Sequence, residues 1–330
     1  MKLQPARVLI FGVSGQDGAY LAQRLLGRGF EVHGTSRDKE ISSYANLHQL
    51  GIYHRVTYHS ALLGEFRTVV NVLDNVRPSY IFNLAAQSSV SLSFEQPVET
   101  IDSIIHGTIN VLEAMRFLGL EAKFYNAASS ECFGNTSQEQ PADETTMFRP
   151  RSPYGIGKAA SFWAAQNYRD AYGLFACSGL LFNHESPLRP ARYVTQKIVR
   201  GAMSIAAGRT RILNLGDLTI ARDWGWAAEY VDAMIRMLDR NTPEDFVIAT
   251  GETNTLADFV AAVFSSFKLG WREHVVINPA LQRPSDISYS SGNPSKAERI
   301  LGWKAEKKMY DVVELLVDAE RKRYARQSAT

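Results

Sequence analysis

Four residues near the middle of the chain have the types and spacing needed for acid–base chemistry. Tyr154 and Lys158 are four positions apart at the start of a predicted helix, so their side chains share one face. A nearby ammonium group favours phenolate, and the sequence therefore predicts a lowered pKa that lets Tyr154 act as a base. Such a pair alone is common and could lie on a surface. Ser129 and Glu131 add a hydroxyl and a carboxylate at the end of a predicted strand, so we expect all four residues to be catalytic.

A glycine turn separates the first predicted strand, 7–11, from the first predicted helix. The order Gly12-Val13-Ser14-Gly15-Gln16-Asp17-Gly18 lets the backbone turn sharply and approach a pyrophosphate, which the helix N-terminus can hold. A tight strand-to-helix turn without a ligand is the alternative. We expect a dinucleotide site that contains Gly12, Gly15, Gln16, Asp17 and Gly18.

The end of the second predicted strand indicates which dinucleotide binds. An NAD site usually has Asp or Glu there, to bind the ribose 2′-hydroxyl. This chain has Ser36 and Arg37 instead, and a guanidinium suits a 2′-phosphate. The sequence therefore predicts NADP as the cofactor, bound in part by Ser36 and Arg37, although Arg37 could also be a solvated loop residue.

Apolar runs alternate with helical patterns as far as residue 183. This alternation predicts an α/β fold with a doubly wound parallel sheet, which is Rossmann-like. We expect a dinucleotide-binding domain over residues 1–183 and a smaller mixed α/β lobe, mainly substrate-binding, over 184–330, with some segments returning to the large domain. Some segments of the second part are too short to build an independent sheet. The predicted strands are 7–11, 30–34, 56–58, 80–84, 123–127, 174–181, 212–215 and 246–249, and the predicted helices are 15–28, 65–76, 98–118, 153–172, 194–207, 227–239, 256–267 and 309–324.

Composition favours a small-molecule enzyme over other classes. The 36 basic and 34 acidic residues give a net charge of +2, which argues against nucleic acid as a partner. No apolar run is long enough to span a membrane. The two cysteines, Cys132 and Cys177, fit a reducing cytoplasm. We expect a cytoplasmic protein with no membrane partner and no metal site.

The glycine turn, the 25-residue spacing from Ser129 to Tyr154 and the Tyr-x-x-x-Lys pair together resemble the extended short-chain dehydrogenase/reductase family. More specific stretches occur in both parts of the chain: GVSGQDGAY at 12–20, FNLAAQSSV at 82–90, RSPY at 151–154, FNHESP at 182–187, VTQKI at 194–198, RDWG at 222–225 and EDFVIATG at 244–251. These stretches are similar to the GDP-mannose 4,6-dehydratases within that family.

The resemblance implies a redox-neutral dehydration of a GDP-linked sugar. Tyr154 would take the proton of the 4-hydroxyl, Lys158 would bind the nicotinamide ribose, and Glu131 would remove the carbon 5 proton and help to expel water. The implied cofactor residues also include Leu84, Ala85 and Ala86. The implied substrate residues are Ser88, Ser130, Asn183, Val194, Lys197, Arg222, Arg283 and Asp286. Surface ion pairs with Asp223 and Asp286 are the alternative for Arg222 and Arg283.

The chain departs from the family pattern at several positions. Ser129 stands where the dehydratases usually have Thr, and Ser60-Ala61-Leu62 replaces a Gly-Asp-Leu whose Asp holds the adenine. The loop Arg37-Asp38-Lys39-Glu40 is short, which favours a homodimer over a homotetramer. Leu188, Pro190 and Trp226 also differ and could reshape the sugar pocket.

Three alternatives remain open at this point. The segments 31–37 and 278–286 look as much like GDP-4-keto-6-deoxymannose reductases, which consume NADPH. A dehydratase acting on a GDP-manno-heptose is a second alternative, because the altered pocket could admit a longer sugar. A catalytically silent cofactor-sensing regulator is a third, although it would have no need for Ser129, Glu131, Tyr154 and Lys158 together.

Overall fold

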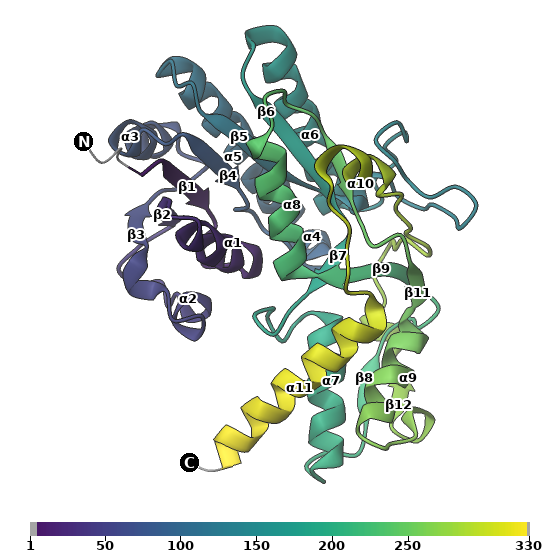
Figure 1. Cartoon of the computed structure of the whole chain (residues 1–330). Helices are drawn as coiled ribbons and strands as arrows, with labels where there is room; N and C mark the ends of the chain where they lie inside the picture. Colours follow the sequence, from purple (N-terminus) through teal and green to yellow (C-terminus); the bar gives the residue numbers. More distant parts are fainter. Residues whose placement is uncertain (1–4, 329–330) are drawn as a thin grey trace.

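A seven-stranded sheet forms the centre of the larger lobe (Figure 1). The structure, a computed structural model, describes residues 5–328. Every strand pairing in this sheet is parallel, in the order β10-β6-β5-β4-β1-β2-β3. The strands are β1 (Arg7–Phe11), β2 (Glu31–Ser36), β3 (Thr57–Ser60), β4 (Tyr80–Asn83), β5 (Lys123–Ser129), β6 (Ala176–Leu181) and β10 (Phe246–Ile248). The strand order changes direction between β1 and β4, where doubly wound sheets bind ligands. The predicted fold class is confirmed.

Helices cover both faces of this sheet, because its strands are apolar on both sides. Val8 and Ile10 of β1 belong to the core beneath α1 and α8, whereas Leu9 and Phe11 belong to the core beneath α3 and α5. This alternation follows from the two-residue period of a strand. The helices of this lobe are α1 (Gln16–Gly27), α2 (Ala45–Gln49), α3 (Phe66–Val76), α4 (Val90–Glu95), α5 (Pro97–Phe117), α6 (Pro153–Tyr172), α8 (Ala227–Asp239) and α10 (Ser295–Leu301), with 3₁₀ turns at Tyr53–Arg55 and Ser130–Cys132.

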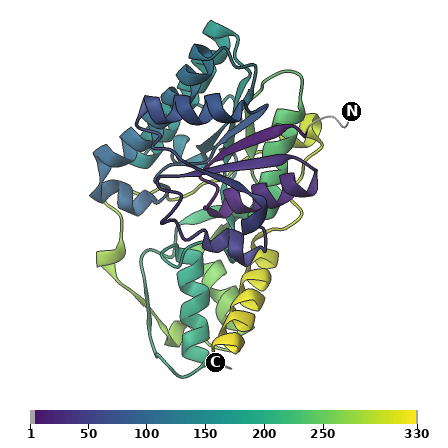
Figure 2. The same ribbon diagram turned by 90° about the vertical axis from the view of Figure 1, so that its left-hand side faces the viewer.

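The smaller lobe has three helices side by side below the large sheet (Figure 2). They are α7 (Val194–Ala206), α9 (Leu256–Ser266) and α11 (Met309–Ser328), and they share an apolar core with Trp224. Two small sheets accompany them: β11-β9-β7 and β12-β8. Their strands are β7 (Asn183–Glu185), β8 (Leu213–Leu215), β9 (Ala221–Trp226), β11 (Thr253–Thr255) and β12 (Val275–Ile277), with 3₁₀ turns at Trp271–Glu273 and Pro279–Leu281. The expectation that these segments are too short to form a sheet of their own was wrong.

The chain returns to the large lobe after residue 183. Strand β10 pairs with β6 at the edge of the large sheet, and α8 packs against α1. The smaller lobe is therefore built from segments on either side of this return. Within residues 5–328, no helix is both long and apolar enough to cross a membrane.

Candidate active site

The glycine turn has the close contacts that only glycine permits. Gly12 has a φ of +87°, and a Cβ there would lie 2.9 Å from the Ala85 nitrogen. A Cβ at Gly18 would lie 2.3 Å from the Gly12 oxygen. At Gly15, the residue before α1, a Cβ would meet only the Gly12 oxygen at 3.4 Å, and no side chain caps the helix. The space and free amides at this helix end fit the pyrophosphate of a dinucleotide.

The segment after β4 lies against this turn. The Leu84 nitrogen donates to the Phe11 oxygen at 3.0 Å, and the Ala85 backbone packs on Gly12. Ala86 follows directly in the chain. The predicted cofactor residues Leu84, Ala85 and Ala86 are thus next to the turn, and their contact with a cofactor remains a prediction.

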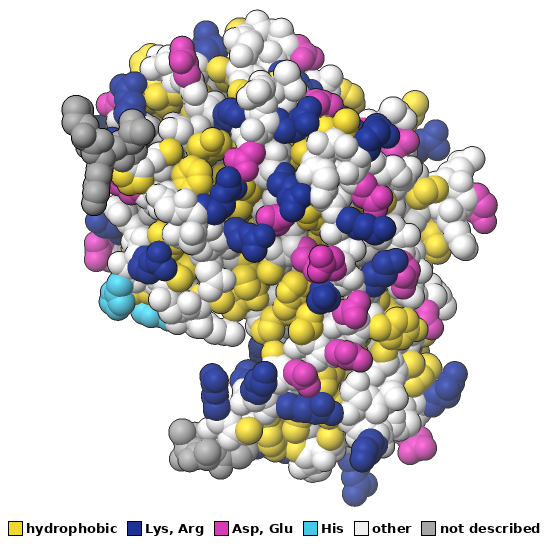
Figure 3. All heavy atoms as spheres, in the orientation of Figure 1, with side chains coloured by type: hydrophobic (Ala, Val, Ile, Leu, Met, Phe, Trp, Pro, Cys, Tyr) yellow, Lys and Arg dark blue, Asp and Glu magenta, His cyan; other side chains and the backbone are white. Residues whose placement is uncertain are grey.

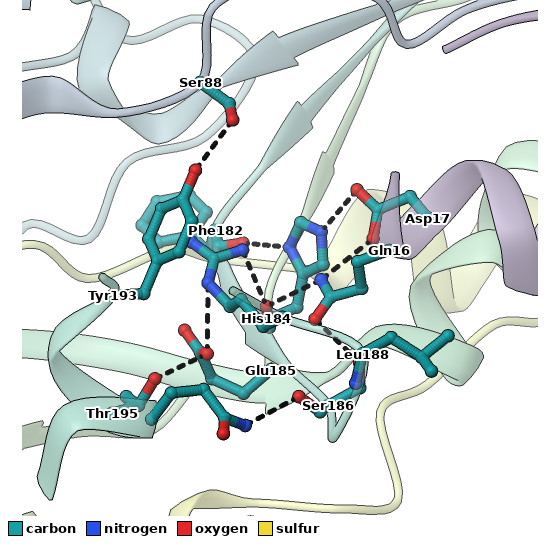
Figure 4. Close-up of polar contacts among 12 residues, drawn as sticks. Gln16, Asp17, Ser88, Phe182, His184, Glu185, Ser186, Leu188, Tyr193 and Thr195 are labelled. Carbon is teal, nitrogen blue, oxygen red and sulfur yellow. Dashed lines mark hydrogen bonds and ion pairs between the residues drawn. The ribbon is translucent and has the colours of Figure 1, made fainter. Parts of the chain in front are cut away.

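The side chains of Gln16 and Asp17 point toward His184 and Ser186 (Figure 4). Asp17 Oδ2 lies 3.0 Å from His184 Nε2, and the Gln16 amide donates to the His184 oxygen at 3.2 Å. The Ser186 hydroxyl donates to Gln16 Oε1 at 2.7 Å. Burial raises the pKa of Asp17, but the charge and hydrogen bond of His184 outweigh it and the net pKa is lowered. These side chains therefore join the two lobes, and the cofactor contact of Gln16 and Asp17 remains a prediction.

The predicted 2′-phosphate residues lie at the end of β2. Arg37 is exposed there, whereas the Ser36 hydroxyl lies 2.9 Å from the Tyr44 hydroxyl. Tyr44 is buried in a left-handed backbone conformation with a φ of 44°. The sequence analysis did not single out Tyr44, because nothing in the spacing from Ser36 predicts this contact.

The end of β5 and the start of α6 are held together by small residues. The Ser152 hydroxyl caps α6 by accepting from the Gly155 nitrogen at 3.0 Å, and it also bonds the Glu131 side chain. A Cβ at Gly155 would lie 2.8 Å from the Glu131 oxygen. Tyr154 and Lys158, on α6, are therefore placed directly beside Ser129 and Glu131.

The predicted lowering of the Tyr154 pKa was wrong for this protein. Burial raises the pKa of Tyr154 well above 10, a hydrogen bond from Ser129 opposes this, and the charge of Glu131 adds to it. Lys158 does not reverse the effect, because its Nζ donates to the Ala127 oxygen at 2.7 Å and lies 5.8 Å from the Tyr154 ring centre. Burial also lowers the pKa of Lys158 to about 8, so its charge is itself disfavoured.

A pocket of about 350 Å³ lies between the lobes. It brings together many of the predicted substrate residues, and Glu131 is the catalytic candidate in its wall. Predicted residues that line it are Ser88, Glu131, Asn183, Val194, Lys197, Arg222, Arg283 and Asp286. Figure 3 shows the surface hollowed between the two lobes, with Lys and Arg side chains on the small-lobe side.

Ser130 is a predicted substrate residue that the pocket does not include. It is 4% exposed, in the 3₁₀ turn that follows β5. The pocket instead contains Glu185, Arg189, Arg192 and Tyr193, which were not predicted. Pro187 and Pro190 in the sequence mark a loop beside these residues, and loops carry many binding sites.

The two predicted arginines share one carboxylate in the pocket wall. Arg222 Nη2 lies 2.9 Å from Asp286 Oδ1, and Arg283 Nη1 lies 3.1 Å from the same oxygen. Arg222 is only 5% exposed, so this is not a surface pair. Asp223 does not pair with it, because the Asp223 carboxylate accepts from backbone nitrogens at 250 and 251.

The charges of Arg222, Arg283 and Asp286 act on the carboxylate of Glu131. Burial raises the pKa of Glu131, while Arg222 and Arg283 lower it and Asp286 raises it, and the net pKa is raised. A carboxylate with a raised pKa and cations nearby can take up and return a proton.

The fold and site define a dinucleotide-binding α/β enzyme of the short-chain dehydrogenase/reductase type. A UDP-glucose 4-epimerase from Thermus thermophilus, solved in complex with NAD, has a TM-score of 0.84 at 26% identity and covers 96% of this chain and 99% of its own. The family model described as GDP-mannose 4,6 dehydratase matches residues 9–316. GDP-mannose 4,6 dehydratase 2 of Arabidopsis thaliana is 41% identical, over 96% of this chain and 88% of the relative. GDP-mannose 4,6-dehydratase of Vibrio cholerae is 40% identical, over 91% of this chain and 90% of the relative.

The chain therefore belongs to the GDP-mannose 4,6-dehydratase family, whose members are lyases.

Proposed function

We propose that this protein converts GDP-mannose to GDP-4-keto-6-deoxymannose and water, with NADP as a cofactor that is regenerated in each turnover. The observation that carries the proposal is Glu131, a carboxylate with a raised pKa in the wall of a cationic pocket, next to Tyr154. Dehydration needs a base and then an acid between its two hydride transfers, and Glu131 could serve as both.

Tyr154 would remove the proton of the sugar 4-hydroxyl. Tyr154 would accept this proton as the phenolate, which the Ser129 hydrogen bond stabilises, while carbon 4 is oxidised to the ketone. NADP bound there would supply the hydride acceptor for carbon 4 and the hydride donor for carbon 6, and the proton that Tyr154 took would be released as a solvent proton adds to carbon 5. Lys158, fixed on the Ala127 oxygen beside Tyr154, would orient the nicotinamide ribose.

Glu131 would then act twice. The new ketone acidifies the carbon 5 proton, which the carboxylate takes, and the resulting carboxylic acid protonates the departing 6-hydroxyl. Arg222 and Arg283 would hold the diphosphate through charge-assisted hydrogen bonds, with Lys197 at the same pocket wall.

NADP rather than NAD is the proposed dinucleotide. The support is Arg37, which is exposed at the end of β2, and the absence of an acid from that strand end. Ser60-Ala61-Leu62 replaces the family's Gly-Asp-Leu, so the Asp that would bind the adenine is missing. The contact with the 2′-phosphate would therefore contribute a larger share of the binding free energy.

We also propose a cytoplasmic homodimer. Exposed apolar side chains lie along α5 and α6, two helices that pack against each other, and the free cysteines suit a reducing compartment. These exposed side chains are Val98, Phe117, Ile156, Trp163 and Tyr172. Sedimentation of the purified protein tests the assembly, and a monomer at micromolar concentration would contradict it.

The decisive experiment is the mass of the product formed from GDP-mannose with catalytic NADP and no added reductant. Loss of one water supports the proposal. A requirement for stoichiometric NADPH would favour the reductase alternative. Faster turnover of GDP-manno-heptose than of GDP-mannose would assign the longer sugar instead.

A further inference from the structure

Two hydroxyl groups from different lobes meet at the pocket. Ser88, in the loop between β4 and α4, lies with its Oγ 2.7 Å from the hydroxyl of Tyr193, the residue before α7. Both residues line the pocket, and their side chains point toward each other in Figure 4. This pair, the Ser88–Tyr193 clasp, crosses from the large lobe to the small one.

Arg189 packs against the ring of Tyr193 and forms an ion pair with Glu185. The Arg189 guanidinium lies 3.9 Å from the ring centre and Arg189 Nε lies 3.1 Å from Glu185 Oε2. The Thr195 hydroxyl donates to the same Glu185 oxygen at 2.6 Å. Glu185 has a side chain only 3% exposed, so this support is fixed in the protein interior. The Tyr193 hydroxyl is therefore presented at a defined position.

The clasp keeps hydrogen-bonding capacity for a ligand. When one hydroxyl donates to another, the accepting hydroxyl still has its own hydrogen, and both oxygens keep free lone pairs. A clasp of Ser88 and Tyr193 can thus donate one hydrogen bond and accept others, which suits the hydroxyl groups of a sugar.

The clasp lines the same pocket as Glu131. Burial is the main influence on the pKa of Tyr154, and the charges of Glu131 and then Tyr193 act in the same direction. Tyr193 therefore acts electrostatically on Tyr154 and shares the pocket wall with Glu131, the two groups proposed to act on the sugar. Leu215, Gly216 and Leu281, which also line the pocket, come from β8 and the 3₁₀ turn at Pro279–Leu281 in the small lobe.

We propose that the Ser88–Tyr193 clasp binds the ring hydroxyls of the sugar, and that Tyr193 is a specificity-determining residue for the hexose. The inference rests on the proposed function, because it takes the pocket ligand to be a GDP-linked sugar. It adds Tyr193, for which sequence analysis made no prediction, to the residues that contact the substrate.

Tyr193→Phe tests this, because it removes the hydroxyl and keeps the ring that stacks on Arg189. Calorimetry on cofactor-free protein measures the affinities for GDP-mannose and for GDP without turnover. The affinity for GDP-mannose should fall about 3- to 10-fold, as expected for loss of about one neutral hydrogen bond. The affinity for GDP should stay within about 2-fold of the parent, since GDP has no sugar to reach the clasp.

A second pair of variants checks the clasp itself. Ser88→Ala should show the same selective loss, and the double variant should lose less than the product of the two single losses, because the hydroxyls act together. Tyr310→Phe, an exposed tyrosine on α11, is the matched control and should leave both affinities unchanged.

The outcomes separate this proposal from the proposed function. Equal losses for GDP and GDP-mannose would show that Tyr193 only supports the pocket wall, and no loss for either would also overturn the inference. Full additivity in the double variant would show that the two hydroxyls do not act as a pair. If the parent releases no water from GDP-mannose, the proposed function fails whatever Tyr193→Phe does.

Discussion

Lys158 allows a quantitative test of how burial sets the acid–base properties of the site. The residue is 7% exposed, and burial lowers its pKa from 10.5 to about 8. The folded protein therefore binds this proton less tightly than the unfolded chain does. At about 1.4 kcal/mol per pH unit, the buried ammonium costs about 3 kcal/mol of folding free energy at pH 7.

The sign of the pH dependence follows from the lowered pKa. Below pH 8 both states are protonated and the cost is complete. Between pH 8 and 10.5 the folded protein is neutral at Lys158 while the unfolded chain is still charged, so the cost shrinks as pH rises. The contribution of Lys158 to the free energy of unfolding should therefore rise with pH across this window.

Lys158→Met keeps the length of the side chain and removes the charge. Between pH 7 and pH 9.5 the parent should gain about 2 kcal/mol of stability relative to this variant. Methionine also loses the hydrogen bond to the Ala127 oxygen, which contributes about 1.5–3 kcal/mol for a charged donor. This loss offsets the gain from removing the buried charge, so the free energies of unfolding of parent and variant differ little at pH 7. The change of the difference with pH is the informative quantity.

Urea unfolding of the cofactor-free parent and Lys158→Met at pH 7 and pH 9.5 measures how their stability difference changes with pH. Lys304→Met is the control, because that side chain is 73% exposed and its variant should differ from the parent by the same amount at both pH values. A difference between the parent and Lys158→Met that stays constant within about 0.5 kcal/mol would refute the reasoning. Lys158 would then be neutral or hydrated at pH 7.

Three further predictions concern activity and binding. Glu131→Gln should lower turnover about 10²–10⁴-fold and accumulate reduced cofactor absorbance when GDP-mannose is added, and normal turnover would contradict the base role. Arg283→Ala should weaken GDP binding by about 1.5–3 kcal/mol in calorimetry, whereas exposed Arg272→Ala should not; an affinity within about 2-fold of the parent would make Arg283 only an ion-pair partner. Arg37→Ala should reduce the affinity for NADP and leave that for NAD unchanged, and equal titrations of parent and variant with NADP would remove Arg37 from the site.

The sequence was sufficient to predict the large lobe because its signals are local. The Gly12 turn follows a buried strand and opens a helix, and the required positive φ and close contact with Ala85 match that pattern. Helix boundaries such as 153–172 agree with the structure because Pro153 and Gly173 mark the ends. In the small lobe, strands of three residues such as Thr253–Thr255 show no period, so only their partners in space define them.

The contacts that the sequence could not predict join residues far apart in the chain. Asp17 meets His184 at a separation of 167 residues, and Ser88 meets Tyr193 at 105. The raised pKa of Tyr154 was missed for a related reason. The spacing to Lys158 showed a cation nearby but not the burial of both groups, and burial has the larger effect here.

The arrangement around Glu131 explains how one carboxylate could be first a base and then an acid. Burial raises its pKa, and the charges of Arg222 and Arg283 oppose this rise. A diphosphate bound to these arginines would neutralise part of their charge and raise the pKa of Glu131 again. Because Asp286 already bonds both arginines, they remain in place before the diphosphate arrives. Substrate binding would thus make the Glu131 carboxylate a stronger base for the carbon 5 proton, and the acid formed in that step would then protonate the departing 6-hydroxyl.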